Sequence, residues 1–308
     1  MKSRRKFLVQ SIASAGGFAS VLPLISAQNF SNMFSASPYQ KEIGLQLYTV
    51  RNQLGQDFEG TLKAVKQAGY FQIEGGDLEQ IKKAKPIAND LGLEIRSSFL
   101  QWSFFTGRWD IATANGMEKP DYGIEKLIDD AAELGLQYLV FGYMWPEERS
   151  TLDDYRKTAE NTNKIGELCA KSGIKLCYHN HAFEFEPIDG VVPYDIFIER
   201  FDNNAIRFEL DVFWADLAGV DPVKLMKRLD GRIRLLHLKD KLAGTPTIYD
   251  EKEVPENAFK ELGNGVVKLK KVIKLAEKIG VEQCMVEQDQ SPDPIQSIQT
   301  SINYINNI

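Results

Sequence analysis

The chain has 308 residues, of which 43% are hydrophobic and 26% are charged. This composition is typical of a globular protein, and it excludes a disordered chain, a fibrous repeat and a disulfide-stapled miniprotein. The formal net charge of −6 argues against a surface that binds nucleic acid through its phosphates.

The first 27 residues have the features of an export signal. Arg4 and Arg5 stand in the string SRRKFL, which matches the twin-arginine type, and a weakly apolar run follows over residues 18–25. That run is too short and too broken to span a bilayer well. We therefore expect a cleaved signal, export by the twin-arginine route to the periplasm, and no stable membrane span afterwards. A retained anchor and a basic tail are the alternatives. Residues 28–40 are predicted to form a flexible tether.

From residue 41 onward, short apolar runs alternate with amphipathic stretches. The predicted strands are residues 43–50, 71–75, 94–100, 138–144, 174–181, 206–213, 233–239 and 284–288. The predicted helices include residues 58–68, 78–91, 123–134, 152–172, 222–229, 266–279 and 294–306. Several of these helices end at a glycine that leads into the next strand, as at Gly69 and Gly92, where a left-handed cap costs little.

The repeated unit of helix, glycine and strand indicates parallel βα units. Eight such units over residues 41–308 predict an α/β protein made of a single (β/α)8 TIM barrel. An open doubly wound sheet is the alternative, but no Gly-x-Gly-x-x-Gly motif follows the first strand. No shift in composition marks a second domain.

All three histidines of the chain lie at or near the ends of predicted strands. In a TIM barrel these strand ends form the active-site face. Because side chains alternate along a strand, His179 and His181 share one face of theirs. If that face points inward, one of the two converges with Asp211, His237 and Glu287 from three further strands. Such a mixed nitrogen and oxygen set suits Mn²⁺, Zn²⁺, Co²⁺ or Fe²⁺ better than Ca²⁺. A polar cluster without metal is the alternative.

Six motifs resemble those of the sugar phosphate isomerase/epimerase proteins, whose barrel is similar to that of xylose isomerase. They are GLQLYTVR at 44–51, YHNHAFEF at 178–185, ELDVFW at 209–214, HLKD at 237–240, LGNG at 262–265 and VEQD at 286–289. The resemblance covers residues 41–308. It implies a TIM barrel with one divalent metal, identity open, held by ligands on strands five to eight. Carried over, these ligands are His179, Asp211, His237 and Glu287.

Two positions depart from the family pattern. His179 stands where strand five of the family usually has Glu, and Trp214 stands where a His often follows the Asp of strand six. The resemblance implies proton abstraction next to a carbonyl by two glutamates, beside a metal that polarises the substrate oxygens. With one Glu replaced, Glu287 remains as a catalytic base. The further catalytic candidates are His181, Lys239 and Glu184.

The residues that we expect to bind substrate are mostly aromatic, because aromatic faces stack on the apolar faces of sugar rings. This set comprises Tyr48, Glu74, Trp102, Trp145, Trp214 and Asn180. The long segments 101–121 and 242–262 are candidate lids, since long loops at this face commonly carry specificity.

Together these features predict a divalent-metal-dependent isomerase or epimerase that acts on a non-phosphorylated ketose or polyol. A metal-dependent lyase or dehydratase of keto-sugars or 3-keto-glycosides is the first alternative. A non-catalytic carbohydrate-binding barrel is the second. The expected partner is a small-molecule carbohydrate, with no nucleic acid, and a homo-oligomer is compatible with the sequence.

Overall fold

The computed structural model describes residues 37–308. The predicted export signal lies outside the described residues, as does most of the predicted tether. The end of that tether is not a loop: residues 38–40 belong to helix α2 (Pro38–Glu42). Tyr39 in this helix is buried, and its hydroxyl donates a hydrogen bond to the carbonyl of Val281 at 2.7 Å. Within residues 37–308, no helix has the length and apolar character that a bilayer crossing needs.

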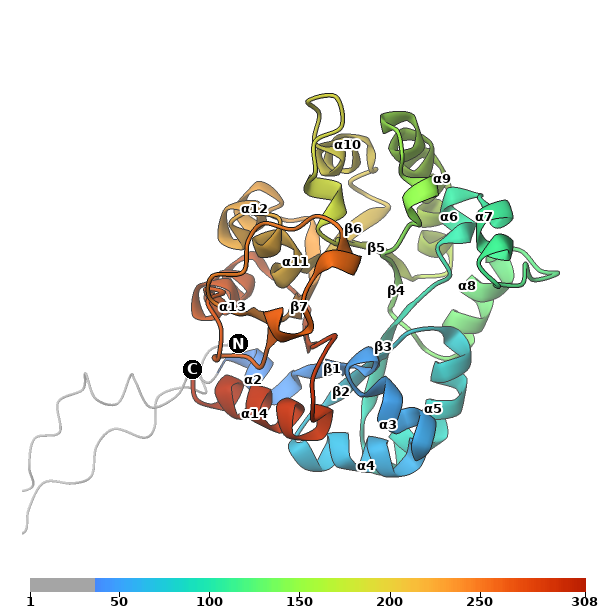
Figure 1. Cartoon of the computed structure of the whole chain (residues 1–308). Coiled ribbons are helices and arrows are strands. Elements are labelled where there is room, and N and C mark those ends of the chain that lie inside the picture. The colour runs from blue at the N-terminus through green and yellow to red at the C-terminus, as the bar shows by residue number, and fades with distance from the viewer. Residues whose placement is uncertain (1–36) are drawn as a thin grey trace, which may run out of the picture. The chain divides into compact units, whose positions relative to one another are not determined.

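Eight parallel strands close into a barrel, in the order β1-β10-β7-β6-β5-β4-β3-β2 (Figure 1). These strands are β1 (Gly44–Gln46), β2 (Gln72–Gly75), β3 (Glu94–Phe99), β4 (Tyr138–Phe141), β5 (Lys175–His179), β6 (Ile206–Asp211), β7 (Ile233–Leu238) and β10 (Gln283–Val286). The predicted TIM barrel is therefore confirmed, and the open doubly wound sheet is excluded. Two short strands outside the barrel, β8 (Asp240–Lys241) and β9 (Phe259–Lys260), pair antiparallel.

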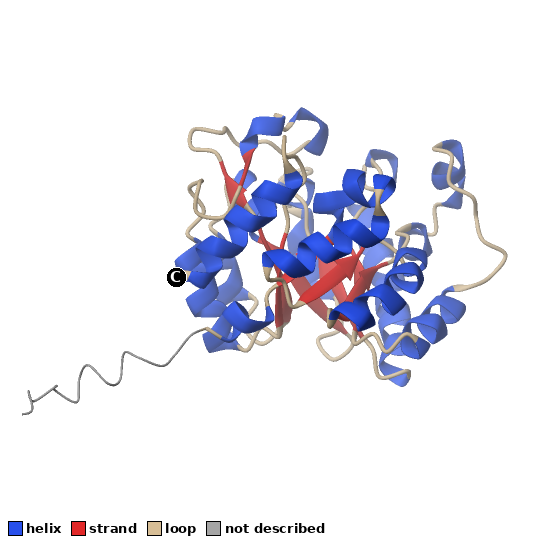
Figure 2. Cartoon of the chain, turned by 90° about the horizontal axis from the view of Figure 1, so that it is seen from below, coloured by secondary structure: helices blue, strands red, loops and turns tan. Residues whose placement is uncertain are grey.

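The helices pack around the outside of the strands (Figure 2). After α2 they are α3 (Arg51–Gln56), α4 (Phe58–Ala68), α5 (Leu78–Leu91), α6 (Ser103–Thr106), α7 (Trp109–Ala114), α8 (Ile124–Glu133), α9 (Leu152–Lys171), α10 (Pro193–Arg200), α11 (Val212–Leu217), α12 (Pro222–Arg228), α13 (Leu269–Ile279) and α14 (Pro294–Asn306). Helices α4, α5 and α14 begin and end where the sequence predicts.

Several strands are shorter than predicted because polar side chains turn the chain at their ends. The first strand stops at Gln46, whose side-chain oxygen accepts a hydrogen bond from the backbone N–H of Tyr48 at 3.0 Å. Strand β6 stops at Asp211, which caps the unpredicted helix α11. Its Oδ1 accepts from the backbone N–H groups of Phe213 at 2.8 Å and Trp214 at 2.9 Å. An aspartate in this position satisfies the free donors of a helix start.

The barrel interior is layered. Tyr138, Val140, Cys177 and Leu235 form a small apolar cluster of their own inside the barrel. Cys177 lies two residues before His179 on β5, and Leu235 lies two residues before His237 on β7. Because side chains alternate along a strand, each of these apolar residues points inward on the same face as the histidine that follows it. The apolar layer therefore closes the barrel below, and the polar residues follow towards the carboxyl ends of the strands.

Candidate active site

The four predicted metal ligands meet at the carboxyl ends of four neighbouring strands. His179 ends β5, Asp211 ends β6, His237 lies one residue before the end of β7, and Glu287 follows β10. Nδ1 of His237 lies 2.8 Å from Oε2 of Glu287. Oδ2 of Asp211 lies 3.9 Å from both Nε2 of His179 and Nδ1 of His237. One ligand atom each from these two histidines and Asp211 all lie within 4.8 Å of one another.

The two oxygens of Asp211 have different surroundings. Oδ1 caps helix α11, whereas Oδ2 is buried and accepts no hydrogen bond of good geometry from any described residue. A buried carboxylate oxygen without a well-aligned hydrogen bond is costly, and a bound cation would compensate it. Two imidazole nitrogens and two carboxylates are the donor set that Zn²⁺ and similar ions prefer. The residues present therefore fit a divalent metal.

Lys239 brings a positive charge into the same space. Its Nζ lies 2.7 Å from Oε2 of Glu287, 2.8 Å from Oδ1 of Asp289 and 3.1 Å from Oδ2 of Asp211. The side chain is only 2% exposed. Burial alone would lower the pKa of Lys239, but the three carboxylates outweigh it and hold that pKa well above its usual range. Burial raises the pKa of Asp289 to about 7.

A second layer of polar side chains lies beneath the ligands. Oε1 of Glu74 accepts hydrogen bonds from Gln46 at 2.9 Å and from Nε2 of His237 at 2.7 Å. The hydroxyl of Ser97 donates to the other oxygen of Glu74. Oε2 of Glu209 lies 3.1 Å from Nδ1 of His179. Burial and the neighbouring Glu74 raise the pKa of Glu209 to about 8.

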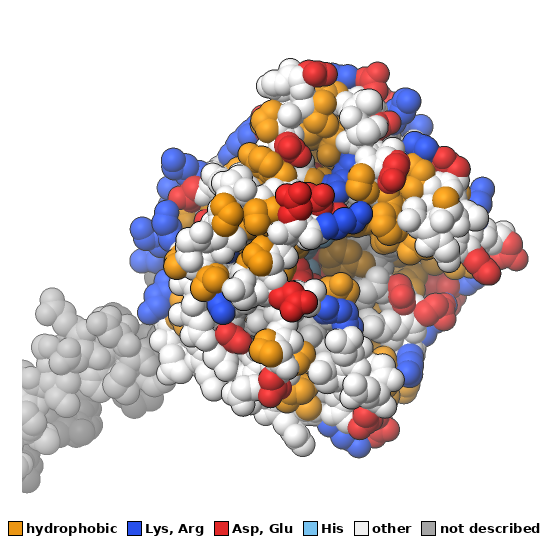
Figure 3. All heavy atoms as spheres, in the orientation of Figure 1, with side chains coloured by type: hydrophobic (Ala, Val, Ile, Leu, Met, Phe, Trp, Pro, Cys, Tyr) orange, Lys and Arg blue, Asp and Glu red, His pale blue; other side chains and the backbone are white. Residues whose placement is uncertain are grey.

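Above the ligands opens a cavity of about 650 Å³. In Figure 3 this face of the molecule is hollowed near its centre, with acidic and basic side chains at the rim. Its lining combines polar residues with apolar and aromatic ones: Gln46, Tyr48, Gly76, Asp77, Phe99, Leu100, Gln101, Trp102, Met117, Gly142, Tyr143, His179, His181, Trp214, Lys239, Glu251, Val254, Glu256, Phe259, Glu287, Asp289 and Gln290. The candidate lids, segments 101–121 and 242–262, both supply lining residues.

The predicted substrate residues divide into two groups. Tyr48, Trp102 and Trp214 line the cavity. Glu74, Trp145 and Asn180 are not among its lining residues. Glu74 lies in the buried layer described above. Trp145 packs against Trp102, with ring centroids 5.8 Å apart. Asn180 is fully buried, and its side chain forms hydrogen bonds with the backbone N–H and carbonyl of Asp211 at 3.1 and 3.2 Å.

The catalytic candidates also divide into residues that line the cavity and one that does not. Lys239 and Glu287 line the cavity, and so does His181. Burial and the charge of Lys239 lower the pKa of His181 to about 3, so this ring is neutral at physiological pH. Glu184 is fully buried outside the cavity lining. It accepts hydrogen bonds from the hydroxyl of Tyr178 at 2.6 Å and from the backbone N–H of His181.

The cavity is acidic. Its described lining contains five carboxylates, namely Asp77, Glu251, Glu256, Glu287 and Asp289. Lys239 is the only Lys or Arg among these lining residues, and it is already paired with three carboxylates. A phosphate group would find no free cation in this wall.

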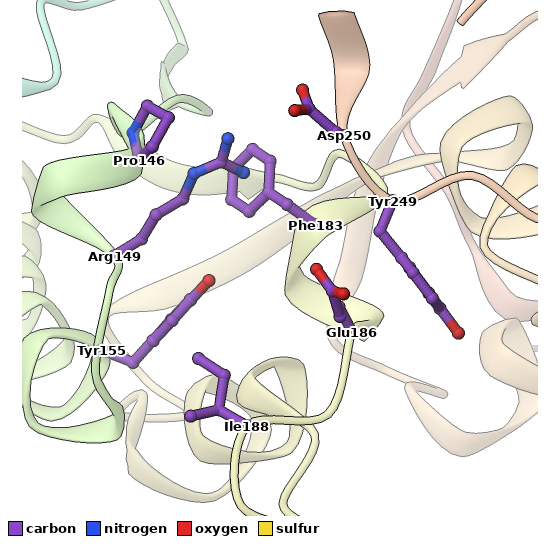
Figure 4. Close-up of a pocket in the computed structure, with 8 residues that line it drawn as sticks. All are labelled: Pro146, Arg149, Tyr155, Phe183, Glu186, Ile188, Tyr249 and Asp250. Atoms are coloured by element: carbon purple, nitrogen blue, oxygen red, sulfur yellow. The ribbon is translucent and has the colours of Figure 1, made fainter. Parts of the chain in front are cut away.

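A buried ion pair separates the main cavity from a smaller one of about 220 Å³, drawn in Figure 4. Arg149 lines the smaller cavity and Glu251 lines the larger. Nη2 of Arg149 lies 2.9 and 3.1 Å from the two carboxylate oxygens of Glu251. The guanidinium also lies 3.4 Å from the ring centre of Phe183, which Figure 4 shows beside it. Glu251 also accepts a hydrogen bond from the hydroxyl of Tyr143 at 3.0 Å.

Sequence reasoning left several cavity and site residues without a role. Asp289 stands two residues after Glu287, and Glu209 two residues before Asp211, so strand alternation could have assigned both. Gln46 stands inside the first recognised motif. Glu251 belongs to segment 242–262, which the sequence places at this face as a candidate lid, but no signal in the sequence singles out Glu251 within that segment.

Comparisons with known proteins agree with this geometry. A family model described as "Xylose isomerase-like TIM barrel" matches residues 62–308. The inosose dehydratase of Geobacillus kaustophilus is 24% identical over 195 residues, which cover 58% of this chain and 60% of the relative. The chain spans 49% of a second inosose dehydratase, from Clostridium botulinum, so the matches to these relatives cover about half of their length or slightly more.

Two solved structures extend the comparison. A crystal structure of a sugar phosphate isomerase/epimerase from Parabacteroides distasonis is 26% identical. It has a TM-score of 0.66, and the match covers 88% of this chain and 95% of that one. The IOLI protein, solved with a bound zinc atom, has a TM-score of 0.63 at 14% identity, with 86% and 98% of the two chains covered. At that identity the second likeness shows the fold alone.

Proposed function

This chain belongs to the xylose isomerase-like TIM barrel family, and we propose that it is a divalent-metal-dependent enzyme that removes a proton next to the carbonyl of a non-phosphorylated keto-sugar. The observation that carries the proposal is the meeting of His179, Asp211, His237 and Glu287 at the floor of the cavity, with Lys239 among them. A non-catalytic binding barrel would not need an acid and a base in contact at this place.

The residues at the floor have distinct parts in such a reaction. His179, Asp211, His237 and Glu287 would hold the ion, which would polarise the substrate oxygens and so acidify the adjacent C–H bond. Glu287 is the base: its Oε2 lies 2.7 Å from Nζ of Lys239 and faces the ligand site, which leaves Oε1 to take the proton. Lys239 is charged, and its ammonium can donate a proton to an oxygen of the substrate.

A second candidate is elimination, as in a lyase or dehydratase, and the position of His179 favours it. Epimerisation returns a proton to the opposite face of the carbanion and so needs a second acid there. Strand β5 carries His179 at that place, with Nδ1 directed at Glu209. Elimination needs one base and one acid, which Glu287 and Lys239 supply. The likeness to inosose dehydratases supports the same reaction class.

The acidic cavity supports a substrate without phosphate. Five carboxylates line it, and the single lysine is engaged by three of them. The aromatic part of the wall, which includes Tyr48, Trp102 and Trp214, offers faces that a sugar ring can stack on.

The test is a metal analysis combined with proton exchange. The purified chain is incubated in D₂O with a panel of ketoses and 3-keto-glycosides and followed by ¹H NMR. We expect one metal per chain and deuterium entering next to the carbonyl. An epimer or isomer as product would indicate the isomerase reaction, and an eliminated group would indicate the lyase. Absence of both metal and exchange would contradict the proposal and leave a carbohydrate-binding protein.

We also propose that the protein is exported by the twin-arginine route and acts in the periplasm. The string SRRKFL, with Arg4 and Arg5, supports this. Replacement of both arginines by Lys should leave the precursor in the cytoplasmic fraction. Unchanged export of that double variant would contradict the route.

A further inference from the structure

The two ring nitrogens of each histidine at the site, His179 and His237, lie near different carboxylates. Nε2 of His179 is directed at Asp211, and its Nδ1 lies 3.1 Å from Oε2 of Glu209. His237 is turned the other way round. Its Nδ1 faces Glu287 and Asp211, while its Nε2 lies 2.7 Å from Glu74 and 3.4 Å from the same Oε2 of Glu209. One oxygen of Glu209 therefore lies within reach of both rings.

Strand β6 explains why Glu209 reaches both histidines. In the parallel register, Glu209 is paired with His179 of β5, and Asp211 is paired with His237 of β7. Glu209 and Asp211 stand two residues apart, so both side chains point into the barrel, one layer above the other. Asp211, in the upper layer, faces Nε2 of His179 and Nδ1 of His237. Glu209, in the lower layer, faces the other nitrogen of each ring.

The surroundings of Glu209 make a purely structural role costly. The side chain is completely buried, and its Oε1 has no donor among the described residues. A buried carboxyl group lowers stability unless its hydrogen bonds compensate it. The contacts of Glu209 with the two histidine rings are therefore the ones that account for its presence in this layer.

We propose that Glu209 is a positioning residue that fixes the tautomers and orientations of both histidine ligands. The inference rests on the metal site proposed above. By accepting from Nδ1 of His179, Glu209 leaves Nε2 of that ring free as a ligand. By sharing Nε2 of His237 with Glu74, it leaves Nδ1 of that ring free. The two histidines therefore present opposite nitrogens to the same site. Carboxylates that hold ligating histidines in this way set both the ring orientation and the metal affinity.

The first test uses the unmodified protein, because its three histidines can be resolved individually. In the zinc-loaded, ¹⁵N-histidine-labelled chain, two-dimensional ¹H–¹⁵N spectra report which nitrogen of each ring carries the proton. We expect His179 to be protonated at Nδ1 and His237 at Nε2. Finding the same nitrogen protonated in both rings would overturn the inference without any variant.

The second test compares two substitutions of Glu209. Glu209→Leu removes the acceptor at similar volume and should weaken zinc binding by about 10- to 100-fold. Glu209→Gln keeps one oxygen acceptor and should restore part of the affinity. The readouts are the zinc dissociation constant from chelator competition and the absorption spectrum of the cobalt-loaded protein. Glu148→Gln is the matched control: this glutamate is also buried, and its partners, Thr106 and the N–H of Trp145, are not ligands.

The outcomes separate this inference from the proposed function. An unmodified chain that binds no zinc or cobalt would remove the metal site itself. Normal metal binding by the unmodified chain, with unchanged affinity and cobalt spectrum in Glu209→Leu, would overturn only the role of Glu209. Two metals per chain would also overturn it, because Glu209 would then be a ligand together with Glu74 and His237.

Discussion

The ammonium nitrogen of Lys239 lies 2.7 Å from Oε2 of Glu287 at the floor of the cavity. Strand β7 leads into the lysine, and the glutamate directly follows the neighbouring strand β10, so the barrel register brings them together. A base and an acid in contact can remove and supply protons at adjacent atoms of one substrate. The contact also stabilises the charged form of each partner, because the ammonium and the carboxylate carry opposite charges.

Replacing the base should stop proton exchange. In Glu287→Gln, we expect the rate of deuterium incorporation into the ketose to fall by about 10²- to 10⁴-fold, because the amide cannot accept the proton. The measurement is the same ¹H NMR experiment in D₂O. Glu282→Gln is the control, since Glu282 precedes β10 at the opposite end of the barrel and pairs with Lys175. Exchange at the normal rate in Glu287→Gln would show that another group is the base.

Replacing the acid should destabilise the metal-free protein more than the loaded one. Lys239→Met leaves Asp211, Glu287 and Asp289 without their buried counter-charge. Removing one partner from a buried pair typically costs about 3–5 kcal/mol. A bound divalent cation replaces part of that charge, so zinc should recover part of the loss. Chemical denaturation with and without zinc measures both values. An equal loss in the two states would contradict this account.

The regular part of the fold could be predicted because its signals are local and periodic. Helices α4, α5 and α14 were predicted with correct ends, since caps such as Asp57 and Gly69 mark them in the sequence. The strand ends were predicted too long. There the side chain of Gln46 or Asp211 turns the chain through hydrogen bonds to backbone groups ahead of it. Apolar residues after these turns, such as Phe213, are buried in a helix. Their residue types are the same as those of a buried strand, so the sequence does not show where the strand ends.

The candidate site could be predicted only where strand alternation governs it. His179, Asp211 and His237 converge as expected because each lies on a strand with a fixed inward face. Glu184 was expected at the site, but its carboxylate turns back to hold the N–H of His181. This turn follows the end of β5, where the strand alternation that predicts side-chain direction no longer applies. The Arg149–Glu251 contact joins residues about a hundred positions apart, which one sequence does not reveal.

The buried carboxyl of Glu184 should make stability depend on pH. Burial raises its pKa to about 7 in the folded protein, above its ordinary value of 4.5. The folded state thus binds more protons than the unfolded state between these values, and stability is lost as the pH rises through that window. The stability of the wild type relative to Glu184→Gln should fall by about 3 kcal/mol between pH 4 and pH 8. Denaturant unfolding at several pH values measures this difference, and a constant difference would contradict the prediction.

The acidic wall should discriminate against phosphate esters. We expect a ketose phosphate to have a kcat/KM at least about tenfold below that of the same ketose without phosphate, which corresponds to roughly 1.4 kcal/mol. The reason is repulsion by the lining carboxylates, of which Asp77 and Glu256 form no ion pair within residues 37–308, while Lys239 is already paired. Added salt should narrow the gap, because it screens exposed charges such as Glu256. A preference for the phosphate ester would contradict the proposed substrate class.

Breaking the Arg149–Glu251 pair should loosen the wall that segment 242–258 contributes to the cavity. Glu251 and Val254 of this segment line the cavity, and the guanidinium of Arg149 holds both oxygens of Glu251. In Arg149→Gln, we expect faster backbone amide exchange across residues 242–258. We also expect KM to rise by about tenfold, with a smaller change in kcat, because substrate contacts are lost while Glu287 stays in place.

An exposed arginine on the same face provides the control for that change. Arg108 pairs with Asp110, and both side chains are largely exposed, with 43% and 66% of their surface accessible. Exposed ion pairs contribute only about 0–1 kcal/mol, so Arg108→Gln should leave KM and the exchange of residues 242–258 unchanged. The buried pair differs because, among residues 37–308, Glu251 would keep only the hydroxyl of Tyr143 as a hydrogen-bond partner. If amide exchange in this segment is the same in Arg149→Gln as in the wild type, the ion pair does not hold the wall.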